Sequence, residues 1–306
     1  ENGTISYSFK VNAEFKDTIS ATAADTAGHT LGYENGIVYV IDATSPFIDV
    51  NYITKGGSKI VDSIRYFNDD VTVKFAIKEE NFELAEKAPT VTVDGEMTLS
   101  LDWKYNETDL VWEASQTFSK EGDYSLNVEF TDASGNSMDV YKSNICVDKT
   151  LPVVSVSAEK GNTEYAPRIL TVKVNEENFD CSDVNVDVIA QNITGAYVSG
   201  IEDYKQYAKN PDNWNSVGSE HTLELPVFDV DAIYTFDISY TDSATNEAPD
   251  FPAEEFIVDT TAPENINIEY MDPIVQKRIK AFTFGFYAEK VRVTVTVDDI
   301  TSGIDK

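Results

Sequence analysis

A short phrase recurs three times along this chain at intervals of about one hundred residues. Its copies run over 147–152, 258–263 and, more loosely, 41–46, and each copy ends in a proline. The intervals between Pro46, Pro152 and Pro263 are 152 − 46 = 106 and 263 − 152 = 111 residues. A period this long exceeds the repeat of a solenoid and is close to the length of one β-sandwich domain. The phrase therefore predicts a string of similar β domains.

Other landmarks recur in the same order between the copies of the phrase. They are an acidic turn, a tryptophan and a tyrosine-bearing strand that ends in an Asp/Asn turn: Glu79–Phe82 and Glu176–Phe179, Trp103 and Trp214, Tyr124–Asn136 and Tyr234–Asn246. The segment 17–29 offers a partial counterpart of the last landmark. Several landmarks in constant order indicate a true internal repeat.

The local pattern is β throughout. Apolar and polar residues alternate over 71–77, 153–156 and 291–297, so each run can bury one face of a strand. About seven such strands fit between residues 44 and 149, which favours a Greek-key sandwich. They are expected near 47–53, 70–78, 90–94, 98–104, 110–118, 123–131 and 138–147. Helical signals are few, and 203–209 is expected to form a turn or two. The repeat predicts four parts, namely 1–43, 44–149, 150–260 with an insertion near 190–213, and 261–306.

These motifs resemble the immunoglobulin-like repeats of large bacterial cell-surface proteins and adhesins. The shared features are the Val-Asp-x-Thr-x-Pro linker, the tyrosine-rich strand and the Asp-x-x-Gly-Asn turn. This chain departs from the pattern where Asp242–Asn246 lacks the glycine, where His29 replaces the asparagine, and where Ser45 precedes the linker proline. The resemblance implies an all-β fold of tandem immunoglobulin-like Greek-key sandwiches in an elongated array. It also implies a non-catalytic stalk outside the cell, on a bacterial surface or secreted.

The sequence carries no initiator methionine, signal peptide, transmembrane run or anchoring tail. We therefore expect a section of a longer protein, with direct membrane insertion excluded and neighbouring repeats of the same chain as the nearest partners.

Acidic residues dominate the composition. Fifty-four Asp and Glu against 23 Lys and Arg give a formal net charge of −31. Nucleic-acid binding and attraction to an anionic membrane are excluded, because both depend on clusters of Lys and Arg. Two interpretations of the charge remain open. The carboxylates either form a solvated coat that keeps the protein soluble, or they bind divalent cations that offset their mutual repulsion.

An immunoglobulin-like topology brings the acidic landmarks together at one pole of each domain, where the linker enters. Oxygen-rich clusters of this kind suit Ca²⁺, which takes six to eight oxygen ligands. The resemblance likewise implies Ca²⁺ at the junctions, and no other cofactor. The competing explanation is that these side chains close turns and cap exposed backbone groups without any metal. The candidate ligands at the three linkers are Asp42, Glu79, Glu80 and Asp132; Asp148, Glu176, Glu177 and Asp242; and Asp259, Asp298 and Asp299.

Catalysis is not expected. The two histidines, His29 and His221, fall in different repeats. Nucleophile elbows, phosphate-binding loops and zinc-protease motifs are absent from the sequence. Adjacent carboxylates such as those of Glu79 and Glu80 diverge and recur in each repeat, which argues for architecture rather than glycoside hydrolysis.

Aromatic residues suggest an alternative function. Trp103 and Trp214 align between repeats and are expected to pack in the core. Three tyrosines without counterparts lie in or near the insertion, namely Tyr197, Tyr204 and Tyr207. Such residues could bind a host surface protein or a glycan, as binding hot spots often use tyrosine. Packing of the insertion against its own sandwich is the competing interpretation.

The two cysteines, Cys146 and Cys181, fall in different repeats. Because they lie in different repeats, they cannot form the disulfide within one domain that antibody domains carry. Both are expected near the same junction, so a bridge between domains and two free buried thiols are the alternatives.

Overall fold

The computed structural model describes residues 4–11, 14–159, 164–271 and 291–304. This part of the chain is nearly all β, with one short α-helix and three 3-10 turns among the described residues. It divides into two compact units, Glu1–Lys149 and Thr150–Lys306. No helix among the described residues combines the length and the apolar character that crossing a membrane requires.

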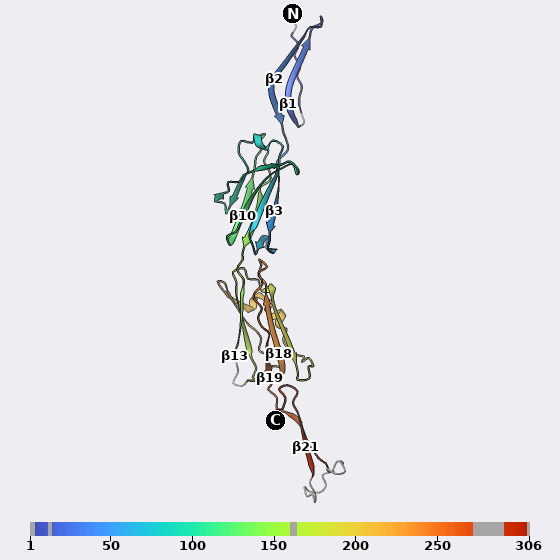
Figure 1. Cartoon of the computed structure of the whole chain (residues 1–306), viewed down its shortest axis with the longest axis vertical. Helices are drawn as coiled ribbons and strands as arrows, with labels where there is room; N and C mark the ends of the chain where they lie inside the picture. The colour runs from blue at the N-terminus through green and yellow to red at the C-terminus, as the bar shows by residue number, and fades with distance from the viewer. Residues whose placement is uncertain (1–3, 12–13, 160–163, 272–290, 305–306) are drawn as a thin grey trace. The chain divides into compact units, whose positions relative to one another are not determined.

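The first unit opens with a two-stranded antiparallel hairpin, formed by β1 (Phe15–Ala24) and β2 (Thr30–Ile41) (Figure 1). Two larger sheets follow. One has the order β3-β6-β10-β9, with bounds Phe47–Thr54, Val71–Lys78, Val111–Phe118 and Lys104–Asn106. The other has the order β4-β5-β12-β11-β7-β8, with bounds Ser58–Val61, Ile64–Phe67, Tyr141–Val147, Gly122–Glu129, Thr90–Val93 and Met97–Thr98. A 3-10 turn, η1 (Phe82–Leu84), follows β6.

Alternation along the strands builds the core between these two sheets. Successive side chains of a strand point to opposite faces, so every second residue of β6 is buried. Phe75 and Ile77 from β6 belong to the same apolar cluster as Leu126 of β11 and Ile145 of β12. Most strands lie antiparallel, and β5 joins the edge of β12 in parallel. The hairpin β4–β5 that contributes this edge was not among the expected strands.

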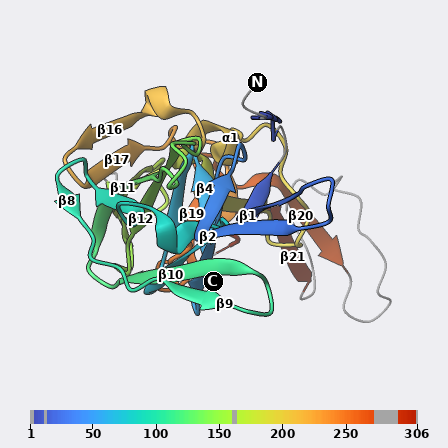
Figure 2. The same ribbon diagram turned by 90° about the horizontal axis from the view of Figure 1, so that it is seen from above.

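The second unit repeats the arrangement with fewer strands. One sheet has the order β13-β14-β17-β16, with bounds Val153–Glu159, Ile169–Asn175, Glu220–Glu224 and Trp214–Val217 (β16 and β17 are labelled in Figure 2). The other has the order β15-β18-β19, with bounds Val184–Gln191, Ala232–Tyr240 and Glu254–Val258. A separate hairpin pairs β20 (Glu264–Met271) with β21 (Arg292–Asp298). The helical elements are η2 (Cys181–Asp183), α1 (Tyr204–Ala208) and η3 (Pro211–Asn213).

The insertion of the second unit packs into its core. Helix α1 forms where the sequence predicted a turn or two, and its N-cap Asp203 accepts a bond from the Gln206 amide. Tyr204 is buried, and its ring stacks on Phe228 at a centroid distance of 4.1 Å. Tyr207 packs against the same core, whereas Tyr197 is exposed. The prediction that these tyrosines could form an exposed ligand-binding site is therefore wrong for Tyr204. Its ring is buried in the apolar core, where a ligand cannot reach it.

The recurring tryptophans pack as predicted. The ring of Trp103 lies 5.7 Å from that of Phe82, and Trp214 lies 4.8 Å from Phe179. Both phenylalanines belong to the recurring acidic turn. Each tryptophan thus anchors the turn that carries the candidate metal ligands.

Three Asp-initiated turns share one hydrogen-bonding pattern. In each, the amide four residues on donates to the aspartate carboxylate, as His29 does to Asp25, Asn136 to Asp132 and Asn246 to Asp242. The fourth residue of the turn has positive φ in all three: Gly28 at 89°, Gly135 at 90° and Thr245 at 75°. Glycine adopts this conformation without cost, whereas a β-branched residue is strained there.

The strained position yields a matched pair of variants. Thr245→Gly is expected to raise the free energy of unfolding of the second unit by about 0.5–1 kcal/mol, because it removes the strain. Gly135→Thr places the same strain in the first unit and is expected to destabilise it by about 1–2 kcal/mol. A Cβ at Gly135 meets no atom within 4 Å, so the effect isolates backbone conformation from packing. Urea unfolding measures both. Equal stability of Thr245→Gly and the parent chain would show that the turn carries no strain.

Candidate metal centre

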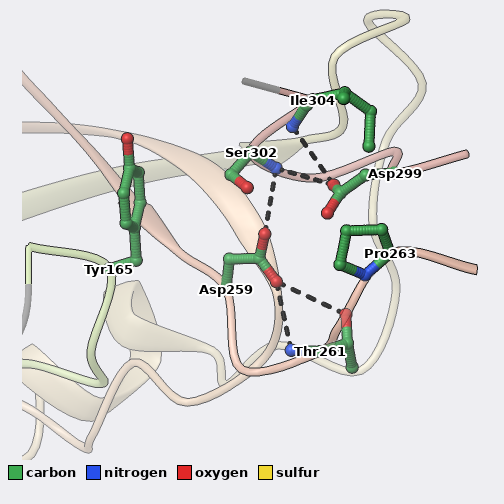
Figure 3. A pocket seen from close by; sticks show the side chains of 8 residues that line it. Tyr165, Asp259, Thr261, Pro263, Asp299, Ser302 and Ile304 are labelled. Atoms are coloured by element: carbon green, nitrogen blue, oxygen red, sulfur yellow. Dashed lines mark hydrogen bonds between the residues drawn. The ribbon is translucent and has the colours of Figure 1, made fainter. Parts of the chain in front are cut away.

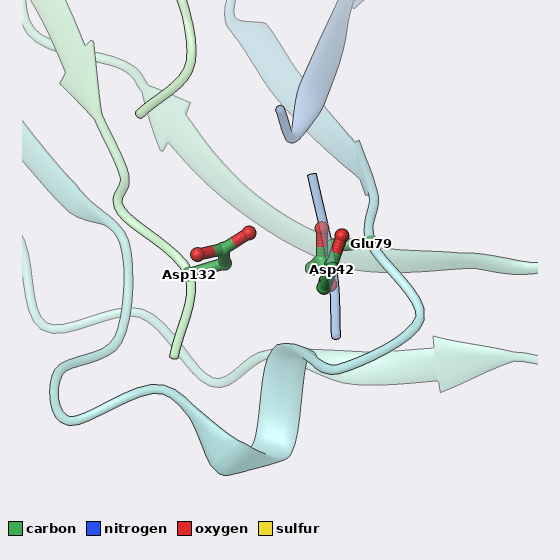
Figure 4. Close-up of side chains that lie close together, drawn as sticks. All are labelled: Asp42, Glu79 and Asp132. Carbon is green, nitrogen blue, oxygen red and sulfur yellow. The ribbon is translucent and has the colours of Figure 1, made fainter. Parts of the chain in front are cut away.

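One acidic centre in the first unit collects carboxylates from three separate segments. Asp42 follows β2, Glu79 follows β6, and Asp132 follows β11. One oxygen from each of the three lies within 4.8 Å of the others (Figure 4). Glu79 and Asp132 are buried, and Asp42 is half-buried. The predicted convergence of linker and turns is therefore present for these three residues.

The turn after β11 holds the Asp132 carboxylate in place. The Ser134 and Asn136 amides both donate to its Oδ1 at 2.8 Å, and the Asn136 side-chain amide donates to its Oδ2 at 2.8 Å. The same Asn136 amide group donates to the backbone carbonyl of Asp42 at 3.1 Å. The linker residue and the turn are thus joined by a direct hydrogen bond.

Asn81 connects the other two carboxylates. Its backbone amide donates to Glu79 Oε1 at 2.7 Å, and its side-chain amide donates to Asp42 Oδ2 at 2.8 Å. Its Oδ1 accepts from Lys16 Nζ of β1 at 2.8 Å. One asparagine side chain therefore ties the hairpin, the linker and the acidic turn together.

Electrostatics at this centre favour a bound cation. Burial raises the pKa of Glu79, and the nearby charges of Asp42, Asp132 and Glu80 raise it further, against the lowering effect of the Asn81 amide. The cause is the cost of holding like charges together away from water. A divalent cation among the three carboxylates would remove that cost.

The donor set suits a hard cation. Carboxylate and carbonyl oxygens are the ligands that Ca²⁺ prefers, at about 2.4 Å from the ion. Two ligands on opposite sides of such an ion lie about 4.8 Å apart, so the spread of these three oxygens fits around a single ion. Asp42, Glu79 and Asp132 could therefore hold Ca²⁺. Glu80 is exposed and stands outside this group, because adjacent residues point in different directions.

The second unit carries the same turn chemistry. Glu176 and Asp242 are buried. Glu176 Oε1 accepts from the Asn178 amide at 2.7 Å, as Glu79 accepts from Asn81. Asp242 accepts from the backbone and side-chain amides of Asn246 at 2.8 Å each. The two poles are thus built by the same local hydrogen bonds.

Two further residues were predicted as ligands at the central linker, Glu177 and Asp148. Glu177 is exposed beside Glu176, as Glu80 is beside Glu79. Asp148 belongs to the first unit, where its amide donates to the Phe67 carbonyl at 2.9 Å. A set of ligands that joins Asp148 to Glu176 and Asp242 stays a prediction.

The residues around the last linker form a third acidic cluster within the second unit, which is less complete than the cluster of the first unit. Asp259 and Asp299 line a pocket of about 420 Å³ together with Tyr165 and Pro263 (Figure 3). Asp259 accepts from the Thr261 and Ser302 amides at 3.1 Å each. Asp299 Oδ1 accepts from three successive amides, those of Thr301, Ser302 and Gly303. Asp298 is exposed and does not line this pocket, because it is the last residue of β21 and Asp299 takes the turn position.

Sequence reasoning missed the asparagines that organise these sites. Asn81 and Asn178 stand two residues after a buried glutamate in both copies of the acidic turn. The recurrence was visible, but only the carboxylates were selected as ligands. His221 was also missed as a supporting residue; its Nε2 lies 2.8 Å from the Glu176 carbonyl oxygen.

Cys146 and Cys181 are both buried. Burial raises the pKa of Cys181, which disfavours the reactive thiolate.

Comparisons with known proteins add no family assignment. No protein-family model matches the chain, and no curated protein matches it either.

Proposed function

We propose that the chain is a run of immunoglobulin-like Greek-key sandwiches. Immunoglobulin domains place strands A-B-E-D in one sheet and C-F-G in the other. The order β3-β6-β10-β9 in the first unit and β13-β14-β17-β16 in the second agrees with the former. The neighbours β7-β11-β12 and β15-β18-β19 agree with the latter.

A tyrosine at the start of the sixth strand supports the same proposal. In immunoglobulin-like domains the hydroxyl of this residue bonds to the backbone a few residues upstream. Tyr124 donates to the Lys120 carbonyl at 2.7 Å. Tyr234 donates to the Val230 carbonyl at 2.8 Å. Both units therefore carry this bond at the same place in the strand.

On this fold the two hairpins are parts of further repeats. β1 and β2 correspond to strands F and G, and β20 and β21 correspond to strands A and B. The repeat boundaries proposed from the sequence, at 43/44, 149/150 and 260/261, then separate four immunoglobulin-like parts.

The function that these features support best is a non-catalytic spacer of a bacterial cell-surface or secreted protein, stiffened by Ca²⁺ at its linkers. The observation that carries it is the centre of Asp42, Glu79 and Asp132, whose carboxylates come from a linker and two turns. A metal there would join parts of the chain that otherwise hinge. By repeat equivalence we propose Asp148, Glu176 and Asp242 as the corresponding ligands of the central linker.

Small-angle scattering with and without Ca²⁺ tests this function. We expect an extended particle whose maximum dimension falls, and whose interdomain flexibility rises, when a chelator removes the metal. The control is the variant Asp42→Asn, Asp148→Asn, Asp259→Asn, which should give the chelated profile at any Ca²⁺ concentration. Identical profiles in Ca²⁺ and chelator would contradict metal-dependent stiffness, and a compact particle in both would contradict the spacer itself.

A further inference from the structure

A groove lies on the outer face of the sheet β3-β6-β10-β9 in the first unit, with a volume of about 320 Å³. The alternation of β6 puts Phe75 and Ile77 into the core and turns Lys74, Ala76 and Lys78 to the opposite face. These three outward residues line the groove. The sandwich therefore carries a hollow polar surface that shares no residue with the candidate metal centre.

The strand register surrounds Ala76 with charged side chains. Asp49 of β3 and Glu113 of β10 oppose Ala76 from its two sides. Lys74 and Lys78 stand two residues before and after it on β6, so both point to the same face as Ala76. A methyl group thus forms the floor between four longer polar side chains, and this difference in size makes the hollow.

The carboxylates at one side of the groove are held in place. Glu113 Oε1 lies 2.9 Å from Lys74 Nζ and accepts from Asn106 Nδ2 at 3.0 Å. The same Asn106 amide group donates to Asp109 Oδ2 at 3.0 Å, and Asp109 also lines the groove. The bonds from Lys74 and Asn106 lower the pKa of Glu113, so this side presents an ionised hydrogen-bond acceptor at neutral pH.

The opposite end of the groove offers groups that are open to a ligand. Within the described part of the chain, the Lys78 ammonium and the Asp49 carboxylate form no hydrogen bond and no ion pair. Phe47 opposes Lys78 across the strands, lines the groove and is 67 % exposed. A donor, an acceptor and an aromatic ring are therefore available at this end.

The second unit shows that the repeat does not require this groove. Three other residues occupy the positions that Asp49, Ala76 and Glu113 have in the first unit, namely Ser155, Lys173 and Thr222. Ala76 and Lys173 both stand three residues before the buried glutamate of the acidic turn, since 79 − 76 = 3 and 176 − 173 = 3. A lysine thus replaces the alanine floor, and two hydroxyl side chains replace the flanking carboxylates. The lining of the groove is particular to the first unit.

Alanine is an unfavourable choice for this position on local grounds. It is depleted in strands, where longer and branched side chains pack better against their cross-strand neighbours. Ala76 lies on the outer face of β6, between two neighbouring strands of the sheet. A sequence that departs from local preference at a single exposed position is typical of a binding site.

We propose that the groove over Ala76 binds a neutral saccharide of one or two pyranose rings. Hydroxyl groups both donate and accept, so vicinal sugar hydroxyls can accept from Lys78 and donate to the carboxylates of Asp49 and Glu113. The apolar C–H face of a pyranose ring can lie against the exposed ring of Phe47. The volume is at the lower end of the range for small-molecule sites, which suits a short saccharide.

The charges around the groove favour a neutral ligand. Three carboxylates and two ammonium groups line it. An anionic sugar would meet the three carboxylates and the field of a chain whose net charge is −31. A cationic ligand would meet the two ammonium groups on either side of the floor. The proposal goes beyond the spacer function, because it gives the first unit a ligand of its own that requires no Ca²⁺.

NMR of the whole chain with methyl-labelled alanine tests the site directly. The probes are four neutral disaccharides, namely lactose, maltose, cellobiose and N,N′-diacetylchitobiose. We expect at least one of them to shift the Ala76 methyl resonance saturably, with a dissociation constant in the millimolar range because the groove is open to solvent. A resonance of Ala76 that none of the four disaccharides moves would overturn the proposal.

Variants of the lining residues are compared by saturation transfer to the bound sugar. Ala76→Lys fills the floor with the side chain that the second unit carries there, and it should abolish binding while thermal unfolding stays as in the parent. Phe47→Ala should raise the dissociation constant about two- to tenfold. The matched control is Ile53→Ala, an exposed apolar residue on the same face of β3 but outside the groove.

Two outcomes of this series would contradict the site. One is parent-like binding by a folded Ala76→Lys chain. The other is equal weakening by Phe47→Ala and Ile53→Ala, which would place the sugar elsewhere on the sheet.

Salt and charged sugars test the assignment of a neutral ligand. Binding of an uncharged sugar should be independent of ionic strength, because salt screens only interactions between charges. Galacturonic acid and glucosamine serve as anionic and cationic probes of similar size to a single ring. Tighter binding of either one than of the neutral sugars, or affinity for a neutral sugar that falls steeply with salt, would overturn the assignment.

Discussion

Tyr204→Ala is expected to lower the free energy of unfolding of the second unit by about 3–4 kcal/mol, as large aromatic-to-alanine changes in a core do. The residue is 3 % exposed, and its ring stacks on Phe228 within the apolar core. Removing it leaves a cavity that short helix α1 cannot fill. Urea or thermal unfolding of the second unit measures the loss.

The matched control is Tyr197→Ala in the same insertion. Tyr197 is 78 % exposed, so its removal should change stability by less than about 0.5 kcal/mol. If the two variants were equally stable, Tyr204 and the insertion would contribute nothing to the core.

Deleting residues 190–213 is likewise expected to destabilise the unit strongly. Helix α1 and Trp214 pack in the core of this unit, and Trp214 Nε1 donates to the Ala208 carbonyl of α1 at 2.7 Å.

Calcium is expected to stabilise the first unit. A ligand that binds only the folded state adds about 2.7 kcal/mol at one hundred times its dissociation constant. Calorimetry in Ca²⁺ and in chelator should therefore differ by several degrees in melting temperature. Asp132→Asn should abolish most of the difference, because it removes one of the three carboxylates that come within 4.8 Å of one another. A melting temperature independent of Ca²⁺ would identify the centre as a set of solvated turns.

Glu79→Gln should have opposite effects on the stability of the first unit in the absence and in the presence of Ca²⁺. Without metal it is expected to stabilise the first unit, because it removes a buried charge whose pKa is raised by burial and by neighbouring carboxylates. With Ca²⁺ it should destabilise the unit, because a ligand is lost. Glu80→Gln removes the same charge from the exposed neighbour, and it should change the stability by a much smaller amount both with and without Ca²⁺. Equal effects of the two substitutions would argue against a specific site.

The pH dependence of the metal-free unit follows from the same residue. A carboxyl whose pKa is raised on folding binds its proton more tightly in the folded state, so its contribution to stability falls as pH rises through that pKa. Acidification from neutral pH toward the raised pKa of Glu79 should thus stabilise the metal-free parent relative to Glu79→Gln. In Ca²⁺ the trend should reverse, because protons compete with the metal for the carboxylate.

The sequence alone predicted the all-β class and most strands. The predicted strands near 47–53, 70–78 and 110–118 correspond to β3, β6 and β10. They were predictable because the alternation of apolar and polar residues along a strand is visible in the local sequence. The predicted strand near 98–104 was placed wrongly: β8 ends at Thr98 and β9 begins at Lys104. The hairpin β4–β5 was missed, because its pairing with β12 is long-range.

The candidate ligands were predictable for the same kind of reason. Asp42, Glu79 and Asp132 stand at fixed places in a repeated pattern, and the expected immunoglobulin-like topology grouped them at one pole of the domain. Their exposed neighbour Glu80 could not be separated from Glu79 by composition, since only the direction of each side chain distinguishes them.

What the sequence by itself determined was periodicity: the repeat, the strand class and the acidic turns. What only the tertiary structure decided was the environment of single side chains. Tyr197 and Tyr204 have the same chemistry and stand in the same insertion, yet one is exposed and the other is stacked against Phe228. The physical reason is that burial depends on contacts between segments far apart in the chain, such as α1 and the residues beside β18, and no local pattern encodes those contacts.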